Sequence, residues 1–394
     1  MTDDRDAGRA TSAAPAVGPV VGMVGAGQLA RMTYQAAIPL GIGFRVLADS
    51  PADSAAQVVP GTEVGDYHSL DDLLDFARGC DVLTFDHEHV PGEHLAALAS
   101  AGVRVAPGGG ALRYAQDKLG MREELTRLGL PCPRYTPVTT VGEVAAFAAA
   151  TSWPVVLKAV SGGYDGRGVW VCETAEQAAQ VLGHGIRLLA EEHVSFGREL
   201  AALVARSPHR QGAAYPVVQT VQRDGVCHEV LAPAPGLAPA RAAEAQRLAL
   251  TIADRLGVTG LLAVELFETG DGLLVNELAM RPHNSGHWTI EGARTSQFEQ
   301  HLRAVLDLPL GAPQPAAPQV VMANIFGGTE PDLYARFTHV MAADPGVKVH
   351  LYGKTVRPGR KIGHVTALGT DATQLRDRAL RAASYLGTGE EQGW

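Results

Sequence analysis

Four glycines fall within the eight residues from Ser161 to Gly168, between two runs of strand-forming residues. The run PVVLKAV precedes this segment and the run GVWVCE follows it, and both have the composition of a β-strand. Because glycine adopts backbone conformations that other residues avoid, a segment so rich in it cannot lie inside a helix or a strand. The pattern therefore predicts a mobile flap between two strands.

Basic side chains beside the flap indicate what it could cover. Lys158 lies near the end of the preceding strand, and Arg167 lies within the flap. Backbone N–H groups of a glycine-rich loop can close over phosphate oxygens, and the two cations would add positive charge. A P-loop would end in Gly-Lys followed by Ser or Thr, whereas Val169 and Trp170 follow Gly168, which excludes a Walker-type site. The alternative is an ordinary hairpin loop.

Two glutamates, Glu265 and Glu277, flank a second glycine turn. The run LLAVELFETGDGLLVNELAMRP has a Gly-Asp-Gly turn centred on Asp271, so a hairpin closed there would pair Glu265 with Glu277 on one face. Two carboxylates in a cross-strand pair repel each other unless a positive group lies between them. A divalent cation fits, and magnesium is favoured because it binds a few carboxylates together with phosphate oxygens. The alternative is a pair of solvated carboxylates on an exposed face.

The N-terminal part alternates strands and helices. VVGMV, FRVLAD, DVLTFD and VRVAP have the pattern of strands, with helical segments between them, which predicts a doubly wound α/β domain. Between the first strand and the first helix lies Gly25-Ala26-Gly27-Gln28-Leu29-Ala30, where a ligand could approach the helix N-terminus. A nicotinamide dinucleotide site, a tight turn without a ligand, and a site for an anion or polar ligand all fit this segment.

Two further loops are dense in polar residues. The loop RPHNSGHW, residues 281–288, is of a kind that usually binds a ligand. Pro282 and Gly286 argue against the helical spacing that His283 and His287 would need to hold zinc. The segment KTVRPGRKIGH, residues 354–364, places basic side chains around a Pro-Gly turn, which fits capture of one phosphate; a solvated charged face is the alternative.

Composition narrows the class of protein. The 394 residues include 33 Lys and Arg against 42 Asp and Glu, a net charge of −9, so we expect no nucleic-acid partner. No run of about 18 apolar residues occurs, so we expect no membrane span. The four cysteines form no Cys-x-x-Cys pair and the N-terminus lacks a secretory signal pattern, which together predict free thiols and a cytoplasmic protein.

Two joints divide the chain, one rich in glycine near residue 113 and one rich in proline at 308–319. We therefore expect a disordered tail over 1–19, an N-terminal α/β domain over 20–113, a central domain over 114–307 with a small lobe at about 130–192, and a C-terminal domain over 308–394. The strands VVMANIFG, KVHLYG and HVTALG should form this last, smaller unit.

In this order the motifs resemble those of the ATP-grasp enzymes, and the full set closely resembles the 5-(carboxyamino)imidazole ribonucleotide synthases of purine biosynthesis. The resemblance covers about residues 20 to 385 and is carried by GQLARM, GGYDGRG, EEHVSFGRELA, NELAMRPHNSGHWT and KTVRPGRKIGH. It implies an ATP-grasp fold of the α/β class, with an N-terminal doubly wound α/β domain, a central two-lobed α+β ATP-binding domain and a small β-rich C-terminal domain. It also implies a homodimer that uses ATP and Mg²⁺, with Mn²⁺ as a possible substitute.

The activity that the resemblance implies is that of a ligase. Aminoimidazole ribonucleotide would condense with bicarbonate at the expense of ATP, through carboxyphosphate. Phosphoryl transfer requires in-line positioning and neutralisation of charge on the γ-phosphate, which the flap, two lysines and a glutamate-bound metal could provide. Carboxyphosphate hydrolyses readily, so it must form in a closed, dry pocket, and the flap would act as the lid.

The resemblance also implies roles for individual residues. ATP would be bound by two phosphate-binding lysines, the flap, an adenine hinge, a ribose ligand and neighbours of the triphosphate. In chain order these residues are Lys118, Lys158, Gly163, Tyr164, Asp165, Gly166, Arg167, Gly168, Val169, Glu191, Glu192, His193, Val194, Glu199, Gln222, Asn276 and Glu277. The metal ligands would be Glu265 and Glu277. The catalytic residues would be Tyr164, Asp165, Arg281, His283 and Lys354. The ribonucleotide would be held by Gln28, Leu29, Glu88, Asn284, Ser285, Lys354, Arg360 and Lys361.

Two other functions compete with this one. A formate-dependent glycinamide ribonucleotide transformylase of the same superfamily would share the ATP and phosphate sites and differ in the acid and the amine. A non-catalytic nucleotide-binding module would keep the flap and the hinge but would have no need of two facing carboxylates. The pair Glu265 and Glu277 therefore discriminates an enzyme from a binding module.

Overall fold

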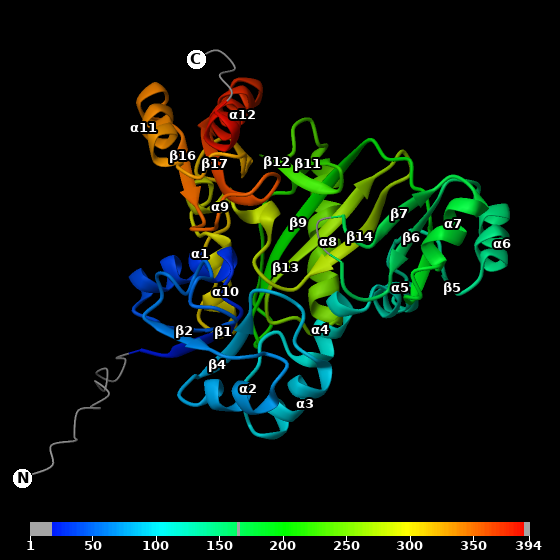
Figure 1. Ribbon diagram of the computed structural model, residues 1–394, viewed down its shortest axis with the longest axis horizontal. Coiled ribbons are helices and arrows are strands. Elements are labelled where there is room, and N and C mark those ends of the chain that lie inside the picture. The colour runs from blue at the N-terminus through cyan, green and yellow to red at the C-terminus, as the bar shows by residue number, and fades with distance from the viewer. Residues whose placement is uncertain (1–17, 164–165, 390–394) are drawn as a thin grey trace, which may run out of the picture.

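The computed structural model describes residues 18–163 and 166–389, and its N-terminal part is a parallel sheet of order β3-β2-β1-β4 (Figure 1). The strands are β1 (Val20–Val24), β2 (Gly43–Ala48), β3 (Gly61–Val64) and β4 (Val82–Phe85). The helical segments are α1 (Gln28–Ala37), η1 (Ile38–Leu40), α2 (Leu70–Ala77), α3 (Gly92–Ser100) and α4 (Gly109–Gln116). Strands β1 and β4 are almost completely buried and mostly apolar, as expected where helices cover both faces of a parallel sheet. The predicted doubly wound α/β domain is confirmed.

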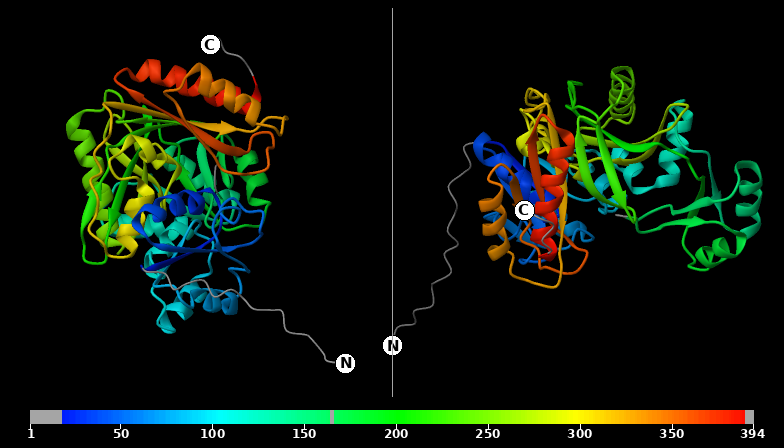
Figure 2. Two further views of the ribbon diagram at one scale, coloured as in Figure 1. Left: turned by 90° about the vertical axis from the view of Figure 1, so that its left-hand side faces the viewer. Right: turned by 90° about the horizontal axis from the view of Figure 1, so that it is seen from above.

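A small lobe follows helix α5 (Lys118–Arg127) and contains an antiparallel sheet of order β5-β8-β6-β7. Its elements are β5 (Tyr135–Val138), α6 (Val141–Thr151), β6 (Val155–Ala159), β7 (Val169–Cys172), α7 (Ala175–Leu182) and β8 (Leu188–Glu192). The glycine-rich segment joins β6 to β7, as predicted, and Lys158 pairs in register with Val169. The lobe projects from one side of the molecule (Figures 1 and 2).

The largest sheet has nine strands in the order β14-β13-β9-β11-β12-β15-β17-β16, with β10 paired to β9. These strands are β9 (Arg198–Arg206), β10 (Gly212–Ala214), β11 (Val218–Arg223), β12 (Val226–Ala232), β13 (Gly260–Glu268), β14 (Leu273–Ala279), β15 (Gln319–Phe326), β16 (Lys348–Leu351) and β17 (Lys361–Gly369). The helical segments around it are α8 (Pro239–Arg255), η2 (Asn284–Gly286), α9 (Thr289–Gly292), α10 (Gln297–Val305), α11 (Tyr334–Ala343) and α12 (Ala372–Thr388).

The three C-terminal strands form where the sequence predicts them, and they continue the large sheet. Strand β15 pairs antiparallel with β12, so the sheet runs across the proline-rich joint. Helix α12 packs on β15 and β17, and α11 packs on α12 (Figure 2). The proposed division into domains remains a prediction. The expected tail lies outside the described residues, apart from its last two.

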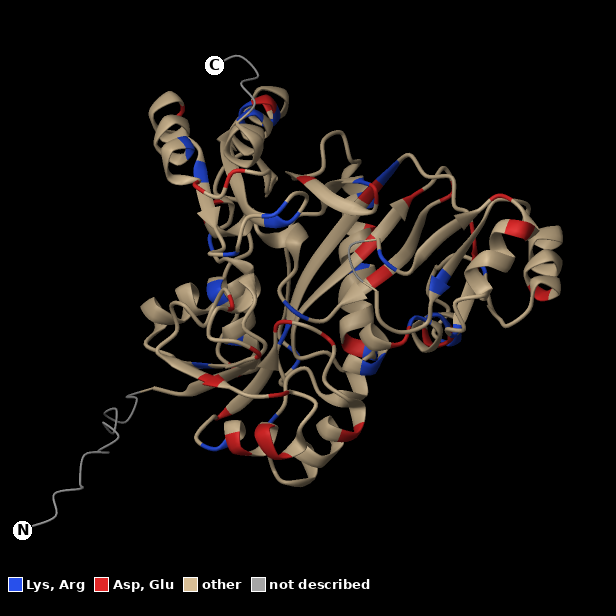
Figure 3. Cartoon of the chain, viewed as in Figure 1, with Lys and Arg blue, Asp and Glu red and all other residues tan. Residues whose placement is uncertain are grey.

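Other expectations from composition concern cysteines and charge. All four cysteines are free, as predicted. Within residues 18–163 and 166–389, no helix has the length and apolar character needed to cross a bilayer. Acidic and basic residues lie together at the centre of the molecule, between the large sheet and the small lobe (Figure 3). This mixed region is where the site described below is found.

A buried arginine connects the small lobe to the large sheet. The Arg122 side chain on α5 is fully buried, and its Nε donates to Glu191 Oε1 on β8 at 2.7 Å. Its Nη1 and Nη2 donate to the carbonyl oxygens of Val275 at 3.0 Å and Asn276 at 2.7 Å on β14. Because the guanidinium binds both sheets at once, it fixes their relative position at the level of the site.

We predict that Arg122→Ala lowers the free energy of unfolding by about 3–5 kcal/mol, because removing one partner leaves the Glu191 carboxylate buried. Urea unfolding measures this loss. The matched control is Arg127→Ala on the same helix, which breaks an exposed pair with Glu124 and should cost about 0–1 kcal/mol. Equal effects of the two substitutions would contradict the role assigned to Arg122.

Candidate active site

A cavity of about 630 Å³ lies where the N-terminal sheet, the glycine-rich segment, the large sheet and the loop after β14 meet. Its wall includes many residues selected from the sequence: Gln28, Leu29, Glu88, Gly163, Gly166, Gln222, Glu265, Glu277, Arg281, His283, Asn284 and Lys361. These residues come from segments far apart in the chain, so the fold collects motifs that the sequence presents separately. Tyr164 and Asp165, predicted to bind ATP and to act in catalysis, lie outside the described residues.

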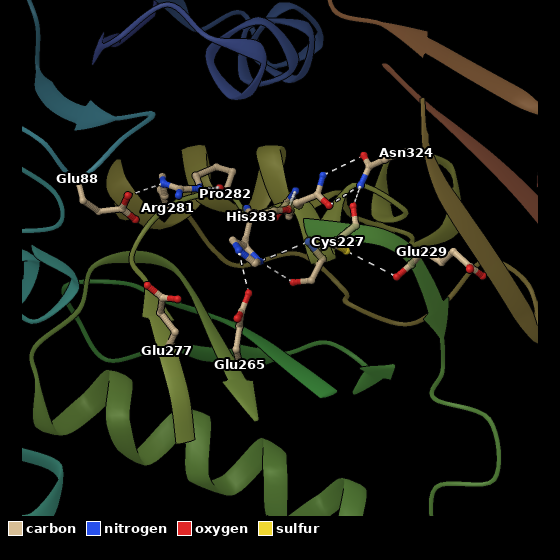
Figure 4. A network of polar contacts seen from close by, with 12 residues as sticks. Glu88, Cys227, Glu229, Glu265, Glu277, Arg281, Pro282, His283 and Asn324 are labelled. Carbon is tan, nitrogen blue, oxygen red and sulfur yellow. Dashed lines mark hydrogen bonds and ion pairs between the residues drawn. The ribbon is translucent and has the colours of Figure 1, made fainter. Parts of the chain in front are cut away.

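Glu265 on β13 and Glu277 on β14 are cross-strand partners, as the sequence predicts (Figure 4). Their side chains are 25% and 45% exposed, respectively, towards the cavity. Burial, followed by repulsion from Glu277 and Glu199, raises the pKa of Glu265 to about 8. Burial acts in the same direction on Glu277, but the Lys118 ammonium that bonds to it, together with Lys158, lowers its pKa. The lysines therefore neutralise one carboxylate, and the other holds a proton near neutral pH.

Lys158 is fixed in position by two partners. Its ammonium donates to Asn276 Oδ1 at 3.0 Å and pairs with Glu191 Oε2 at 2.8 Å. Burial would raise the pKa of Glu191, but Lys158 and Arg122 lower it to about 2. Since this carboxylate is committed inside the protein, the backbone of the predicted adenine hinge, Glu191–Val194, is the part suited to contact a base.

Two predicted nucleotide ligands lie on the neighbouring strands. Glu199 on β9 pairs in register with Thr220 on β11 and Phe267 on β13, and burial raises its pKa to about 7. Gln222 follows a β-bulge in β11 and borders the cavity. A bulge turns a side chain away from the regular alternation of a strand, which accounts for a strand residue facing the site here.

Arg281 connects the loop after β14 to the N-terminal domain. Its Nε donates to Glu88 Oε2 at 2.8 Å (Figure 4). Nearby, the side-chain amides of Asn284 and Asn324 bond to each other, with N···O distances of 3.1 and 2.8 Å. The predicted ligands Arg281, Glu88 and Asn284 are thus held in place by protein partners while they border the cavity.

His283 lies between the loop and the carboxylate pair. Its Nδ1 is 2.8 Å from Ser285 Oγ, and its Nε2 is 3.4 Å from Glu265 Oε1. Burial, and then the charges of Arg281 and Lys361, lower the pKa of His283 to about 3. The imidazole is therefore neutral at physiological pH. Ser285 is buried beneath it, a position that supports His283.

Lys354 reaches the N-terminal domain through a hydrogen bond to the Gln28 side chain. The backbone just before Lys354 is bonded to the connection after β2. Ser54 Oγ donates to the Tyr352 carbonyl at 2.5 Å, and Gln57 Nε2 donates to the Gly353 carbonyl at 2.8 Å. The N-terminal domain thereby fixes Lys354 over the start of α1.

The other predicted ribonucleotide ligands differ in what they can offer. The Leu29 side chain packs in an apolar cluster with Phe298 and Tyr352, so its backbone at the N-terminus of α1 is the part suited to a ligand. The Arg360 guanidinium donates to the Thr355 carbonyl at 3.2 Å in its own segment. Lys361, at the start of β17, borders the cavity. The capture of a phosphate by the basic residues of KTVRPGRKIGH stays a prediction.

Asp86 at the end of β4 borders the site but was not selected from the sequence. Its Oδ2 accepts from the Gly27 N–H at 2.5 Å, and burial raises its pKa to about 6. A Cβ at Gly25, where φ is +97°, would lie 1.9 Å from Asp86 Oδ1, so only glycine fits there. The available signal was topological, because ligands of parallel sheets bind where adjacent strands end. Since Asp86 occupies the Gly27 N–H, the turn is ill suited to a dinucleotide pyrophosphate.

Three family models match successive parts of the chain. Residues 19–116 match the ribonucleotide synthetase preATP-grasp domain, and residues 123–298 match the ATP-grasp domain. Residues 320–378 match the phosphoribosylaminoimidazole carboxylase C-terminal domain.

Individual relatives cover nearly the whole chain. The N5-carboxyaminoimidazole ribonucleotide synthase of Mycobacterium tuberculosis is 56% identical, over 98% of this chain and 93% of its own length. The synthetase structure from Thermus thermophilus has a TM-score of 0.84 and 38% identity, covering 95% of this chain and all (100%) of that one. An Aspergillus clavatus synthase in complex with ADP and 5-aminoimidazole ribonucleotide has a TM-score of 0.85 and 32% identity, covering 93% and 98%. The chain therefore belongs to the N5-carboxyaminoimidazole ribonucleotide synthase family of ATP-grasp enzymes.

Proposed function

We propose that this enzyme carboxylates 5-aminoimidazole ribonucleotide with bicarbonate, forming N5-carboxyaminoimidazole ribonucleotide, ADP and phosphate through carboxyphosphate in purine biosynthesis. The observation that carries the proposal is one cavity bordered by the carboxylate pair, the Arg281–His283 loop and the ribonucleotide side at Gln28 and Lys361. The relatives named above favour this reaction over the transformylase and the non-catalytic binding module.

Magnesium, or manganese in its place, would be held by Glu265 and Glu277. The residues fit a divalent cation because two cross-strand carboxylates face the cavity and repulsion between them helps raise the pKa of Glu265 to about 8. Oxygen ligands of this kind suit Mg²⁺. When bound, the metal would neutralise charge on the phosphate groups of ATP.

The chain's own residues would position ATP. Lys118, which bonds to Glu277, and Lys158, whose charge also lowers the pKa of Glu277, supply two ammonium groups beside the carboxylate pair, and Asn276 holds Lys158 in place. The glycine-rich flap, with Gly163 and Gly166 in the cavity wall, would cover the phosphates. Gly168 and Val169 lead back into β7, and Arg167 would add positive charge. The hinge from Glu191 through Glu192 and His193 to Val194 would contact adenine, and Glu199 the ribose, with Gln222 beside the nucleotide.

Carboxyphosphate, the intermediate, would form beside the loop after β14. His283 is neutral, so its imidazole can accept or donate a hydrogen bond without bringing a charge into the pocket. Arg281, fixed by Glu88, would orient the carboxyl group of carboxyphosphate. A closed, dry pocket limits hydrolysis of such an intermediate. Tyr164 and Asp165 of the flap, and Lys354 over α1, complete the catalytic set that we propose.

The ribonucleotide would lie between α1 and the C-terminal strands. The backbone of Leu29 at the start of α1 and the side chains of Gln28, Lys354, Arg360 and Lys361 would bind its phosphate and ribose, because a helix N-terminus and ammonium groups both favour an anion. Glu88, Asn284 and Ser285 would shape the imidazole side. A homodimer, which the resemblance implies, and a cytoplasmic location, which the sequence composition predicts, belong to the same proposal.

The raised pKa of Glu265 predicts a pH-dependent stability difference between Glu265→Gln and the wild type in the absence of metal. Between pH 4.5 and 8 the unfolded chain loses the Glu265 proton while the folded chain keeps it, so the wild type loses stability as pH rises. The variant has no such titration, and its advantage should grow to about 2 kcal/mol near pH 8, less than the full shift would give at about 1.4 kcal/mol per unit. Urea unfolding in EDTA at pH 5 and pH 8 measures it.

The control for this experiment is Glu123→Gln, which replaces an exposed glutamate on α5. The stability of this variant relative to the wild type should be the same at the two pH values. If Glu265→Gln were more stable than the wild type by the same amount at both pH values, the Glu265 carboxyl would not hold its proton in the folded state.

We further predict that Lys361→Ala raises the KM for the ribonucleotide by about tenfold to a hundredfold, because a charge-assisted hydrogen bond contributes about 1.5–3 kcal/mol. The KM for ATP should change less than about twofold. Steady-state kinetics with each substrate varied in turn measures both constants. Lys348→Ala, an exposed lysine on β16, is the matched control and should change neither. A parallel rise of both KM values would assign Lys361 to the nucleotide site.

The function itself is tested by ADP release in degassed buffer. With 5-aminoimidazole ribonucleotide present, ADP formation should require added bicarbonate and should not respond to formate. Isotopically labelled bicarbonate should appear in an acid-labile carbamate on the amine, with one ADP formed per product. Activity restored by formate, with degassing having no effect, would replace the proposal by the transformylase reaction.

A further inference from the structure

A glutamine at the start of α10 holds the loop that carries His283. The Gln297 side chain is fully buried, and its Oε1 accepts from the His283 backbone N–H at 2.9 Å. Its Nε2 donates to the His283 carbonyl oxygen at 2.8 Å and lies 3.1 Å from His287 Nδ1. The amide thus bonds both backbone polar groups of one residue, as a neighbouring β-strand would, and also reaches a second histidine.

These contacts determine the state of His287. Because the amide oxygen faces the His283 N–H, the amide nitrogen must face His287, and His287 Nδ1 must accept. The proton of the neutral imidazole is then on Nε2. The ring is fully buried at the cavity wall, and burial lowers its pKa well below the usual value. A donor at the position of Gln297 Nε2 is therefore what keeps this histidine in one tautomer.

The rest of the loop is bonded to the same helix start. The Gln297 backbone N–H donates to Thr289 Oγ1 at 2.9 Å, and that hydroxyl donates to the Gly286 carbonyl at 2.5 Å. A Cβ at Gly286 would lie 2.3 Å from Gln297 Oε1, so glycine is required for the side chain to pass. The conformation of the loop therefore depends on its contacts with Gln297.

Helix α10 is itself anchored to both large parts of the molecule. His301 Nδ1 accepts from the Leu261 N–H on β13 at 3.1 Å, and its Nε2 is 2.7 Å from Thr84 Oγ1 on β4. Phe298 packs with Leu29 at the start of α1. The helix that carries Gln297 thus sets the His283 loop relative to β13 on one side and to the ribonucleotide side on the other.

We propose that Gln297 is a positioning residue for the carboxylation reaction: by bonding the His283 backbone and His287 Nδ1, it holds the His283 imidazole beside Glu265 and the cavity. This inference rests on the proposed function of the same site. It gives Gln297 no contact with substrate, so its loss should lower kcat and leave ATP binding nearly unchanged.

The test compares Gln297→Glu with Gln300→Glu, a matched control on the same helix. Gln300 is also fully buried and bonds one backbone residue at two points, with Nε2 2.9 Å from the Gly311 carbonyl and Oε1 2.7 Å from its N–H, away from the site. Both variants place a carboxylate against a carbonyl oxygen, so they should lose comparable stability. Only Gln297→Glu should lower kcat, by tenfold or more at pH 8, with the KM for ATP changing less than twofold.

A pH profile separates positioning from general damage. A protonated carboxyl regains one donor, so kcat of Gln297→Glu relative to the wild type should rise as pH falls from 8 to 6. Gln297→Met removes all side-chain hydrogen bonds at similar volume and should lose as much activity with no such rise, and it serves alone if the Glu variant does not fold. The charged or titratable groups that interact with His283 or His287 are Glu265, Glu277, Arg281, His350, Tyr352, Lys361 and His364, and helix α10 itself carries Glu299, His301 and Arg303. Each variant is therefore compared with the wild type at every pH.

The outcomes are distinct. Equal kcat values for Gln297→Glu, Gln297→Met and Gln300→Glu would overturn the inference. A Gln297→Met variant whose KM for ATP rises while its kcat stays at the wild-type value would overturn it as well. A wild type without bicarbonate-dependent ADP release would instead contradict the proposed function, whatever the variants do.

Discussion

The repulsion between Glu265 and Glu277 is the constraint around which the site is built. Their cross-strand pairing follows from the hairpin β13–β14 and places two carboxylates where a regular sheet would favour apolar or opposite charges. Lys118 bonds to Glu277, Lys158 lies nearby, and Glu265 takes a proton with a pKa of about 8. This arrangement neutralises the pair without a metal, and in the proposed function the two carboxylates would bind a cation when the nucleotide arrives.

Polar contacts connect this carboxylate pair to the other parts of the protein. Lys158 is bonded to Asn276 and Glu191, and Glu191 to Arg122, which in turn bonds the backbone of β14. On the other side, His283 connects Glu265 to the loop after β14, and Arg281 connects that loop to Glu88 of the N-terminal domain. The small lobe, the large sheet and the N-terminal domain therefore all meet the site through charged side chains with defined partners.

Features encoded in local patterns were predictable from the sequence. The glycine-rich flap between β6 and β7 and the register of Glu265 with Glu277 both follow from turn residues and strand periodicity. Partners distant in sequence were not predictable, because the pattern around them carries no local signal. Asp86 bonding Gly27 and Gln297 bonding His283 are of this kind. The continuation of the large sheet from β12 into β15 also depends on tertiary pairing across a proline-rich joint.

The most direct test of this account is the number of protons released when Mg·ADP binds at pH 7. Calorimetric titration in buffers of different ionisation enthalpy measures it. A carboxyl with a pKa of about 8 must give up its proton to bind a metal, so the wild type should release close to one proton more than Glu265→Gln, in which Glu199 still titrates. Binding of Mg·ADP to the wild type without proton release would contradict the claim that the facing carboxylates form the metal site.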